Sequence, residues 1–235
     1  MGFAPACSQL QDLGFDKVEL WITDQFDHLK SSEICDNVDA VVAAFRDASR
    51  LSPVALFLDE QLSPDAFQKI VQFGKALRVG QITIPASPIG TPFNSEIDRL
   101  REQNHMCIEE GIRLSILTRT GLLTEDPHTA TELCQSVKGL GITLDPTYYV
   151  FTPRGEINFD VVFPHVSHAQ LRDTSTKEIQ VPGGLGDIDY NRIIAALKNE
   201  GFDRTLTVDL LPETMSGEER LLELRKLRRL LETLL

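Results

Sequence analysis

Short apolar segments alternate with longer amphipathic stretches along most of the chain. Seven of the apolar segments have strand length, and several are rich in Val and Ile rather than strictly alternating, as expected for strands buried on both faces. We therefore predict seven buried strands, at residues 17–22, 53–58, 81–86, 112–117, 141–145, 166–171 and 206–211.

The stretches between these segments carry the signals with which helices begin and end. Ser63 precedes Pro64 and Asp65, which combine a cap, a first-turn proline and a first-turn acid. Residues 31–49 also have one helical pattern with a Ser cap, and residues 216–235 predict an amphipathic outer helix. Strand and helix repeat without a linker or a change in composition, so we expect one domain over residues 1–235 with a parallel sheet.

Seven strands at this spacing favour a (β/α)₈ TIM-type barrel over an open doubly wound sheet, which usually has about five or six strands. The chain begins with MGFAPACSQLQDLG, a short helical pattern that leads directly into residues 17–22. The barrel is therefore expected to be incomplete, with its first strand short or missing. An open edge between residues 17–22 and 206–211 needs a cover, and a homo-oligomer would provide one.

The charge of the chain excludes several classes of partner. With 35 acidic and 23 basic residues the net charge is −12, and such a surface repels phosphate backbones and anionic lipids. We therefore expect neither nucleic acid nor a membrane as a partner. No apolar run approaches the ~18 residues of a membrane span, and the pattern of a signal peptide is absent. The four cysteines form no CxxC pair, which predicts a reduced, cytoplasmic protein.

Acidic residues end two of the predicted strands. In TIM barrels the active groups lie at the C-terminal ends of the strands, where Asp145 and Asp209 each close an apolar segment. A buried acid needs a cation, a metal or hydrogen-bond donors as a partner. Either acid alone could instead cap a helix or hold a loop, but two acids in one barrel mouth favour a functional site.

Five segments in consecutive order resemble the xylose isomerase-like TIM barrel superfamily, which contains sugar phosphate isomerases and epimerases together with endonuclease IV-type (AP endonuclease family 2-like) proteins. They are residues 14–20, 112–134, 139–149, 166–174 and 183–212, and they include ILTRTG, LDPTYY, HAQLRD and TVDLLP at four predicted strand ends. The nucleases of this group use a three-metal cluster rich in histidine. The five histidines of this chain do not match such a cluster, so nuclease activity is not expected.

The resemblance implies a metal site. Members of this superfamily typically hold one divalent metal with Glu, Asp, His or sometimes Gln, and Glu, at the ends of four consecutive strands. These positions fall on Leu117, Asp145, Gln170 and Asp209. Leu117 can neither bind a metal nor accept a proton, and Asp209 is one methylene shorter than the usual Glu. The remaining oxygen donors suit Mg²⁺ or Mn²⁺ in type, and we expect such a metal to be bound weakly or lost.

Arg119 offers a different way to neutralise the two acids. If its guanidinium turns into the barrel mouth, it takes the place of the cation between Asp145 and Asp209 through bidentate bonds. The alternative is an arginine that points into solvent. The hypothesis requires Arg119 to lie within salt-bridge range of the acids.

The resemblance also implies substrate contacts. Family positions that help to bind substrate fall on Tyr148 and Arg119, and Arg172 lies in a segment whose basic residue meets substrate. For Arg172 a structural ion pair is equally compatible with the sequence. His168 is a candidate catalytic or substrate-contacting residue, or else a buried core histidine. The loop VPGGLGDIDY at residues 181–190 either presents glycine N–H groups to a phosphate or simply turns.

The family chemistry is proton transfer next to a carbonyl, with an enediolate held on the metal and two carboxylates as base and acid. We therefore predict a sugar phosphate isomerase- or epimerase-like protein that acts on a small sugar or sugar phosphate through a reduced metal site, with Asp209 as the remaining base. The alternative is a non-catalytic relative that binds a small polyol or acts as a regulatory or assembly subunit. Leu117 and the missing first strand favour this alternative, and the surviving acids favour the enzyme.

Overall fold

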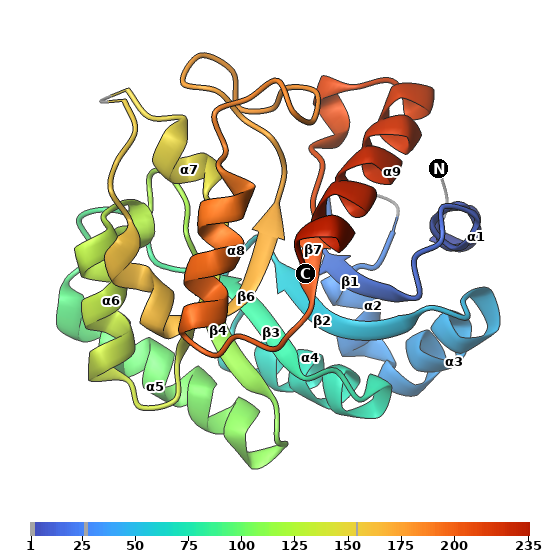
Figure 1. Ribbon diagram of the computed structural model, residues 1–235. Coiled ribbons are helices and arrows are strands. Elements are labelled where there is room, and N and C mark those ends of the chain that lie inside the picture. Colours follow the sequence, from blue (N-terminus) through green and yellow to red (C-terminus); the bar gives the residue numbers. More distant parts are fainter. Residues whose placement is uncertain (1–2, 26–27, 154) are drawn as a thin grey trace. The chain divides into compact units, whose positions relative to one another are not determined.

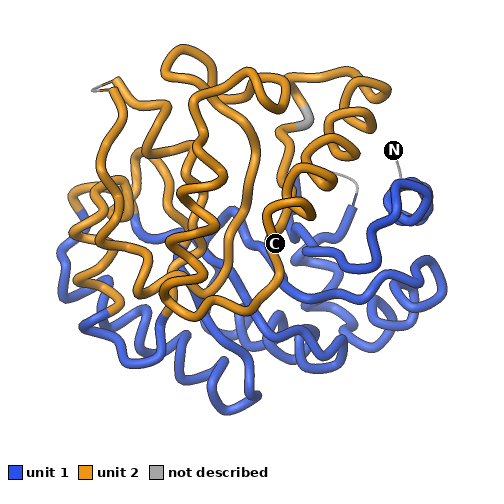
Figure 2. Tube along the Cα trace, in the orientation of Figure 1, with its two compact units in different colours: residues 1–87, 91–116, 135–140 blue, residues 88–90, 117–134, 141–235 orange. Residues whose placement is uncertain are grey.

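The structure, a computed structural model, describes residues 3–25, 28–153 and 155–235 (Figure 1). The chain divides into two compact units (Figure 2). Unit 1 comprises residues 1–87, 91–116 and 135–140, and unit 2 comprises residues 88–90, 117–134 and 141–235. The expected single domain over residues 1–235 stays a prediction.

Unit 1 holds the N-terminal strands. β1 (Lys17–Ile22) pairs with β2 (Ser52–Leu58), and β2 pairs with β3 (Gln81–Pro85), both in parallel. β4 (Arg113–Leu117) comes next in the sheet order, and its last residue belongs to unit 2. The helices of unit 1 are α1 (Phe3–Asp12), α2 (Ser31–Asp36), α3 (Val38–Ala48), α4 (Pro64–Leu77) and α5 (Phe93–Glu109).

The bounds of α4 follow from local sequence signals, as predicted. The Ser63 side chain caps the helix, Pro64 is its first residue, and Arg78 ends it in the left-handed conformation at φ 62°. Phe67, on the apolar face of α4, is completely buried. The element therefore combines a fixed start and end with one apolar face.

The expected single helix over residues 31–49 is instead two helices. Asn37 lies between α2 and α3 at φ −156° and ψ 89°, outside the helical region. Its side chain accepts a hydrogen bond from the N–H of Ala40 at 3.0 Å and so caps α3. Asparagine is among the preferred N-cap residues, and here the cap of a second helix interrupts the amphipathic pattern.

The described part of unit 2 holds the remaining strands. β5 (Gly141–Leu144) pairs in parallel with β6 (Val166–Leu171), and β6 with β7 (Leu206–Val208). Its helices are α6 (Pro127–Ser136), whose last two residues belong to unit 1, α7 (Thr147–Val150), α8 (Tyr190–Asn199) and α9 (Gly217–Leu234). The 3₁₀ turns are η1 (Leu123–Glu125), η2 (Asp160–His165) and η3 (Pro212–Thr214).

The C-terminal elements largely match the predictions. β7 is shorter than the expected residues 206–211, although the N–H of Asp209 still donates to the carbonyl of Leu171 at 3.1 Å. α9 begins with a capping box between Ser216 and Glu219, which confirms the expected C-terminal helix. None of the helices in the described ranges is long and apolar enough to cross a membrane.

Candidate functional site

Three charged residues of unit 2 each follow directly on a strand. Asp145 comes after β5, Arg172 after β6 and Asp209 after β7. Because β6 pairs in parallel with both of its neighbours, the three side chains come together at the C-terminal ends of these strands. We call Asp145, Arg172 and Asp209 the strand-end cluster.

One guanidinium bridges both acids of the strand-end cluster. Arg172 Nη1 donates to Asp209 Oδ2 at 3.0 Å, and Arg172 Nη2 donates to Asp145 Oδ2. The side chains of Arg172 and Asp145 are 2% and 1% exposed, whereas that of Asp209 is 37% exposed. Two carboxylates and one guanidinium carry one net negative charge. Asp209 is the member of the cluster that is exposed to solvent.

The electrostatics of the cluster hold Arg172 in its charged form. Burial by itself lowers the pKa of the Arg172 guanidinium, but Asp145 and Asp209 outweigh it and raise the pKa above its usual value. The ring of Tyr148 lies 5.8 Å from Arg172 Cζ, within the range of a cation–π contact. Burial, followed by the charge of Asp145, raises the pKa of the Tyr148 hydroxyl, so this group stays neutral near pH 7.

Backbone and hydroxyl contacts fix Asp145. Thr118 Oγ1 accepts from the N–H of Asp145 at 2.8 Å and donates to its carbonyl oxygen at 3.0 Å. Asp145 Oδ1 accepts from the N–H of Thr147 at 3.0 Å, in the first turn of α7. Asp145 thus holds donors on both carboxylate oxygens, and its position depends little on any ligand.

Two further predicted residues lie on β6. Side chains alternate along a strand, so His168 and Gln170 share a face with Arg172. Both are buried, and the His168 Nε2 atom lies 3.1 Å from Thr207 Oγ1 on β7. The ring of His168 is therefore held by a cross-strand hydrogen bond, and a role for it in catalysis or substrate binding stays a prediction.

The structure corrects the hypothesis for Arg119. Among the described residues, Arg119 forms an ion pair with neither acid, and Arg172 occupies the place proposed for it. Arg119 is half-buried and lies in the segment after β4. Arg172 can bridge the two acids because β6 lies between β5 and β7, so that one side chain reaches both strand ends. A role for Arg119 and Tyr148 in substrate binding stays a prediction.

The residues of the predicted metal site do not fit a divalent cation. Leu117 is buried and offers no donor atom, and the Oδ2 atoms of Asp145 and Asp209 both accept hydrogen bonds from Arg172. Within the described ranges, no group of three or more His, Cys, Asp or Glu side chains is arranged to hold a metal. A cation would have to share both carboxylates with a positive guanidinium, which repels it.

The glycine loop at residues 181–190 does not present its N–H groups to an external anion. The N–H of Gly183 donates to Glu223 Oε2 at 2.8 Å, and those of Gly184 and Gly186 donate to Asp173 Oδ2 at 2.7 and 3.1 Å. A Cβ atom at position 186 would collide with the Asp173 carboxylate. These glycines serve to close the loop over buried acids, which is the second of the two alternatives left open by the sequence.

Two buried hydroxyl groups of unit 2, those of Tyr190 and Thr147, were not predicted from the sequence as site residues. The Tyr190 hydroxyl, Thr147 Oγ1 and Arg172 Nε are buried without a hydrogen-bond partner in the described part of the chain. Burial raises the pKa of Tyr190, and Asp173 and Asp145 raise it further, so its hydroxyl stays protonated. A tyrosine at the start of α8 carries no sequence signal for such a position, because the acids that act on it, Asp173 and Asp145, lie elsewhere in the sequence.

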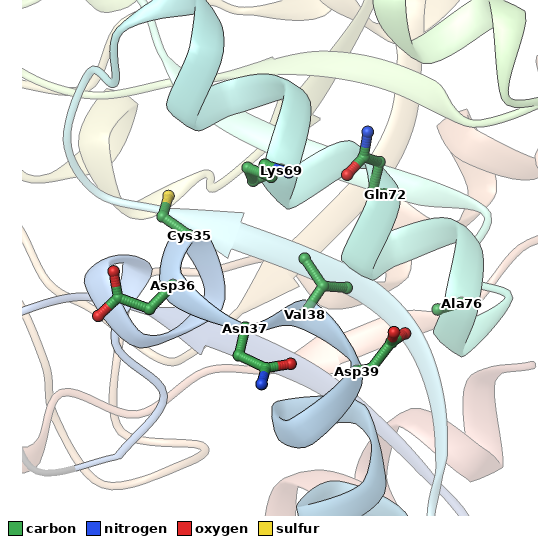
Figure 3. Close-up of a pocket in the computed structure, with 8 residues that line it drawn as sticks. All are labelled: Cys35, Asp36, Asn37, Val38, Asp39, Lys69, Gln72 and Ala76. Carbon is green, nitrogen blue, oxygen red and sulfur yellow. The ribbon is translucent and has the colours of Figure 1, made fainter.

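A separate cavity of about 450 Å³ lies in unit 1 (Figure 3). The junction of α2 and α3 and one face of α4 line it, with residues Cys35, Asp36, Asn37, Val38, Asp39, Lys69, Gln72 and Ala76. Burial raises the pKa of the Cys35 thiol, and the charges of Asp24 and Asp36 raise it further. The thiolate form is therefore disfavoured, and the cavity does not hold an activated nucleophile.

Comparisons with known proteins agree with the fold. A family model described as xylose isomerase-like TIM barrel matches residues 7–232. No curated protein matches the chain. A solved xylose isomerase-like TIM barrel protein from Mycobacterium smegmatis, in complex with magnesium, has a TM-score of 0.79 at 14% identity, covering 99% of this chain and 89% of that one.

Two other solved structures have names that describe an activity. A probable 3-DHS dehydratase, AsbF, from Bacillus anthracis has a TM-score of 0.72 at 14% identity, covering 97% of this chain and 94% of that one. A D-psicose 3-epimerase in the presence of D-fructose has a TM-score of 0.73 at 12% identity, covering 97% and 92%. At these identities the likeness concerns the fold alone. With the seven strands described here, it confirms the predicted TIM-type barrel with one strand fewer than eight.

Proposed function

The chain belongs to the xylose isomerase-like TIM barrel family, and from this premise we propose a sugar isomerase- or epimerase-like protein that binds a small sugar at the strand-end cluster. Support comes from the charged groups at the ends of β5, β6 and β7, where barrels of this kind hold their active residues. The solved epimerase with the same fold, studied with D-fructose, supports a sugar as the ligand.

The observation that carries the proposal is a buried guanidinium shared by two carboxylates, of which Asp209 is the exposed one. Asp209 acts as the base that removes a proton from the carbon next to the sugar carbonyl. Arg172 has more N–H donors than the two acids use, so it donates to the carbonyl oxygen and stabilises the enediolate charge. Asp209 then returns the proton to the former carbonyl carbon, while the hydroxyl proton of the first carbon passes to the former carbonyl oxygen, and a ketose and an aldose are interconverted.

Position 117 decides between two outcomes of this chemistry. Inversion at one carbon requires a second proton carrier on the opposite face of the sugar, and Leu117 supplies none at the end of β4. Isomerisation needs one base that removes and returns the proton on a single face. The strand-end cluster therefore supports isomerisation better than epimerisation.

The ligand that we propose is an unphosphorylated sugar. The strand-end cluster carries one net negative charge, and the N–H groups of the glycine loop already bind Asp173 and Glu223. Both features disfavour a phosphate group. We assign contacts with the sugar hydroxyl groups to Tyr148, Arg119 and Gln170. We propose that His168, which is buried, helps to hold these side chains in position.

We also propose that the protein works in the cytoplasm, as its composition predicts. All four cysteines are free thiols, which agrees with a reducing environment. A homo-oligomer that covers the barrel edge stays a prediction from the sequence.

The proposal is tested by proton exchange in deuterated water. The protein is incubated with a panel of free ketohexoses and aldohexoses and with their phosphate esters, and NMR follows deuterium at the carbon next to the carbonyl. We expect exchange with a free sugar, and a loss of at least about 100-fold in Asp209→Asn. Asp203→Asn, which changes an exposed acid of the same unit, is the matched control and should exchange at the wild-type rate.

The non-catalytic relative is the second candidate, and Leu117 favours it because it removes one carboxylate from the family pattern. For this candidate a free sugar or polyol binds, as ligand-detected NMR would show, but no deuterium enters it. Exchange that is equally fast in wild type and Asp209→Asn would contradict the role of Asp209.

A further inference from the structure

Arg172 lies where a divalent cation would have to lie to use both carboxylates of the strand-end cluster. We propose that its guanidinium is a built-in substitute for that cation, so that the native protein binds no divalent metal there. The inference concerns cation binding alone and holds whether or not the protein turns over a sugar.

The contacts of Arg172 support this assignment. Its two terminal nitrogens donate to one oxygen of each acid, Asp145 Oδ2 and Asp209 Oδ2. A divalent ion bound to the same oxygens at about 2.0–2.2 Å would lie within roughly 5 Å of the guanidinium. Two positive groups at this separation in a buried site repel each other strongly, so the cation and the guanidinium exclude one another.

Burial prevents Arg172 from giving way easily. The side chain is 2% exposed and Asp145 is 1% exposed, and the Tyr148 ring contacts the guanidinium. If Arg172 left, Asp145 would remain as a buried carboxylate without its cation, which is strongly unfavourable. The guanidinium is therefore a permanent part of the site rather than a counter-ion that exchanges with metal.

A latent cation site follows from the same geometry. Without the guanidinium, the Oδ2 atoms of Asp145 and Asp209, which follow β5 and β7, would lose the cation that donates to both of them. Carboxylate oxygens are the ligands that Mn²⁺ and Mg²⁺ prefer. Replacing Arg172 by an uncharged residue of similar length is therefore expected to create a divalent cation site.

The test is a Mn²⁺ titration followed by electron paramagnetic resonance, on purified wild type and on Arg172→Met. We expect no saturable binding by wild type up to about 1 mM Mn²⁺. We expect Arg172→Met to bind one Mn²⁺ per chain, with a Kd at least about tenfold below that limit of about 1 mM. Adding Asp145→Asn to Arg172→Met should abolish this binding. One-to-one binding by wild type that Asp145→Asn removes would overturn the proposal.

A matched control tests whether Mn²⁺ binding follows from the loss of Arg172 in particular or from the loss of any paired arginine. Arg192 also pairs with an acid, Asp160, and lies over an aromatic ring, that of Phe159 at 5.2 Å. Arg192→Met is expected to bind no Mn²⁺, like wild type. Binding by Arg192→Met equal to that of Arg172→Met would also contradict the proposal.

Arg172→Lys provides a second variant that keeps the charge while changing the shape. It is expected to exclude Mn²⁺ as wild type does, because an ammonium group neutralises the acids as a point charge. Circular dichroism reports whether each variant is folded. If Arg172→Met does not fold, the wild-type titration and Arg172→Lys still decide, since Mn²⁺ binding by either at the cluster contradicts a built-in cation.

Discussion

Two arginine–carboxylate clusters, one in each unit, differ in how completely their polar groups are used. In unit 1, Glu96 is 0% exposed, and its two carboxylate oxygens accept from Arg99 at 2.7 and 2.8 Å. The N–H of Ser87 donates to the same carboxylate at 2.9 Å. Arg99 also donates to the carbonyl of Pro85 at 3.1 Å and to Gln103 Oε1 at 2.9 Å. This cluster is closed, and it fastens α5 to the segment after β3.

The strand-end cluster in unit 2 is open by comparison. Arg172 divides its donors between two acids, and its Nε atom has no partner in the part of the chain that the structure describes. Asp209 is more than one-third exposed. A buried ion pair alone therefore does not identify an active site; the strand-end cluster differs from the closed cluster in its unused donor and its exposed carboxylate.

The largest effect that we expect concerns stability and separates the two clusters. Glu96→Ala leaves Arg99 and Ser87 without their buried acceptor, and breaking a buried ion pair typically costs about 3–5 kcal/mol of unfolding free energy. Asp209→Ala leaves Arg172 paired with Asp145, so we expect a loss of about 1 kcal/mol or less. Urea denaturation measures both losses, and equal losses would contradict the distinction between a closed and an open cluster.

The strands and most helices could be predicted because each carries its own local signal. β2 is mostly apolar, β3 is rich in Ile, and α4 has a cap at Ser63 and an apolar face. The break at Asn37 and the short β7 were missed. The break depends on the side-chain cap that Asn37 gives to α3, which an apolar pattern does not record. The apolar residues of 206–211 continue past the last ladder residue of β7, so the pattern does not mark where the strand ends.

The site could be predicted in part. Asp145 and Asp209 could be singled out as candidates because each is a lone acid at the end of an apolar segment and the two come together in one barrel mouth. The sequence left a structural ion pair open for Arg172 but raised a bridge between the two acids only for Arg119, although the alternation His168, Gln170, Arg172 already placed Arg172 on the face of the candidate ligands. The acceptors of the glycine loop could not be found, because Gly183 and Glu223 are 40 residues apart.

A second prediction concerns the stability contributed by the glycine loop around Asp173, a buried acid whose carboxylate accepts hydrogen bonds from backbone N–H groups. Gly186→Ala would bring a Cβ atom against the Asp173 carboxylate and the carbonyl of Thr174, so we expect a loss of about 1–3 kcal/mol. At Gly217 an added Cβ meets nothing within 4 Å, and Gly217→Ala is the control that should not destabilise. Thermal unfolding compares the two variants, and equal Tm values would show that the loop does not close tightly on Asp173.

The smallest effect that we expect is a pH dependence of the closed cluster. Burial by itself raises the pKa of the Glu96 carboxyl, but hydrogen bonds from Arg99 and Ser87 outweigh it and hold the pKa below its usual value of 4.5. A carboxyl whose pKa is lowered in the folded state stabilises the protein above its unfolded pKa, and this contribution is lost as the pH falls through the folded pKa. The unfolding free energy should therefore fall as the pH drops below about 4.5.

Glu96→Gln isolates this contribution, because it removes the titrating group and keeps the shape of the side chain. Urea denaturation between about pH 6 and pH 3 should show a shallower decline of unfolding free energy in Glu96→Gln than in wild type. Glu102→Gln, at an exposed position of the same helix, should keep the wild-type slope. If Glu96→Gln kept that slope too, the acid sensitivity would belong to other carboxylates, and the Glu96–Arg99 pair would contribute less to folding than its closed geometry implies.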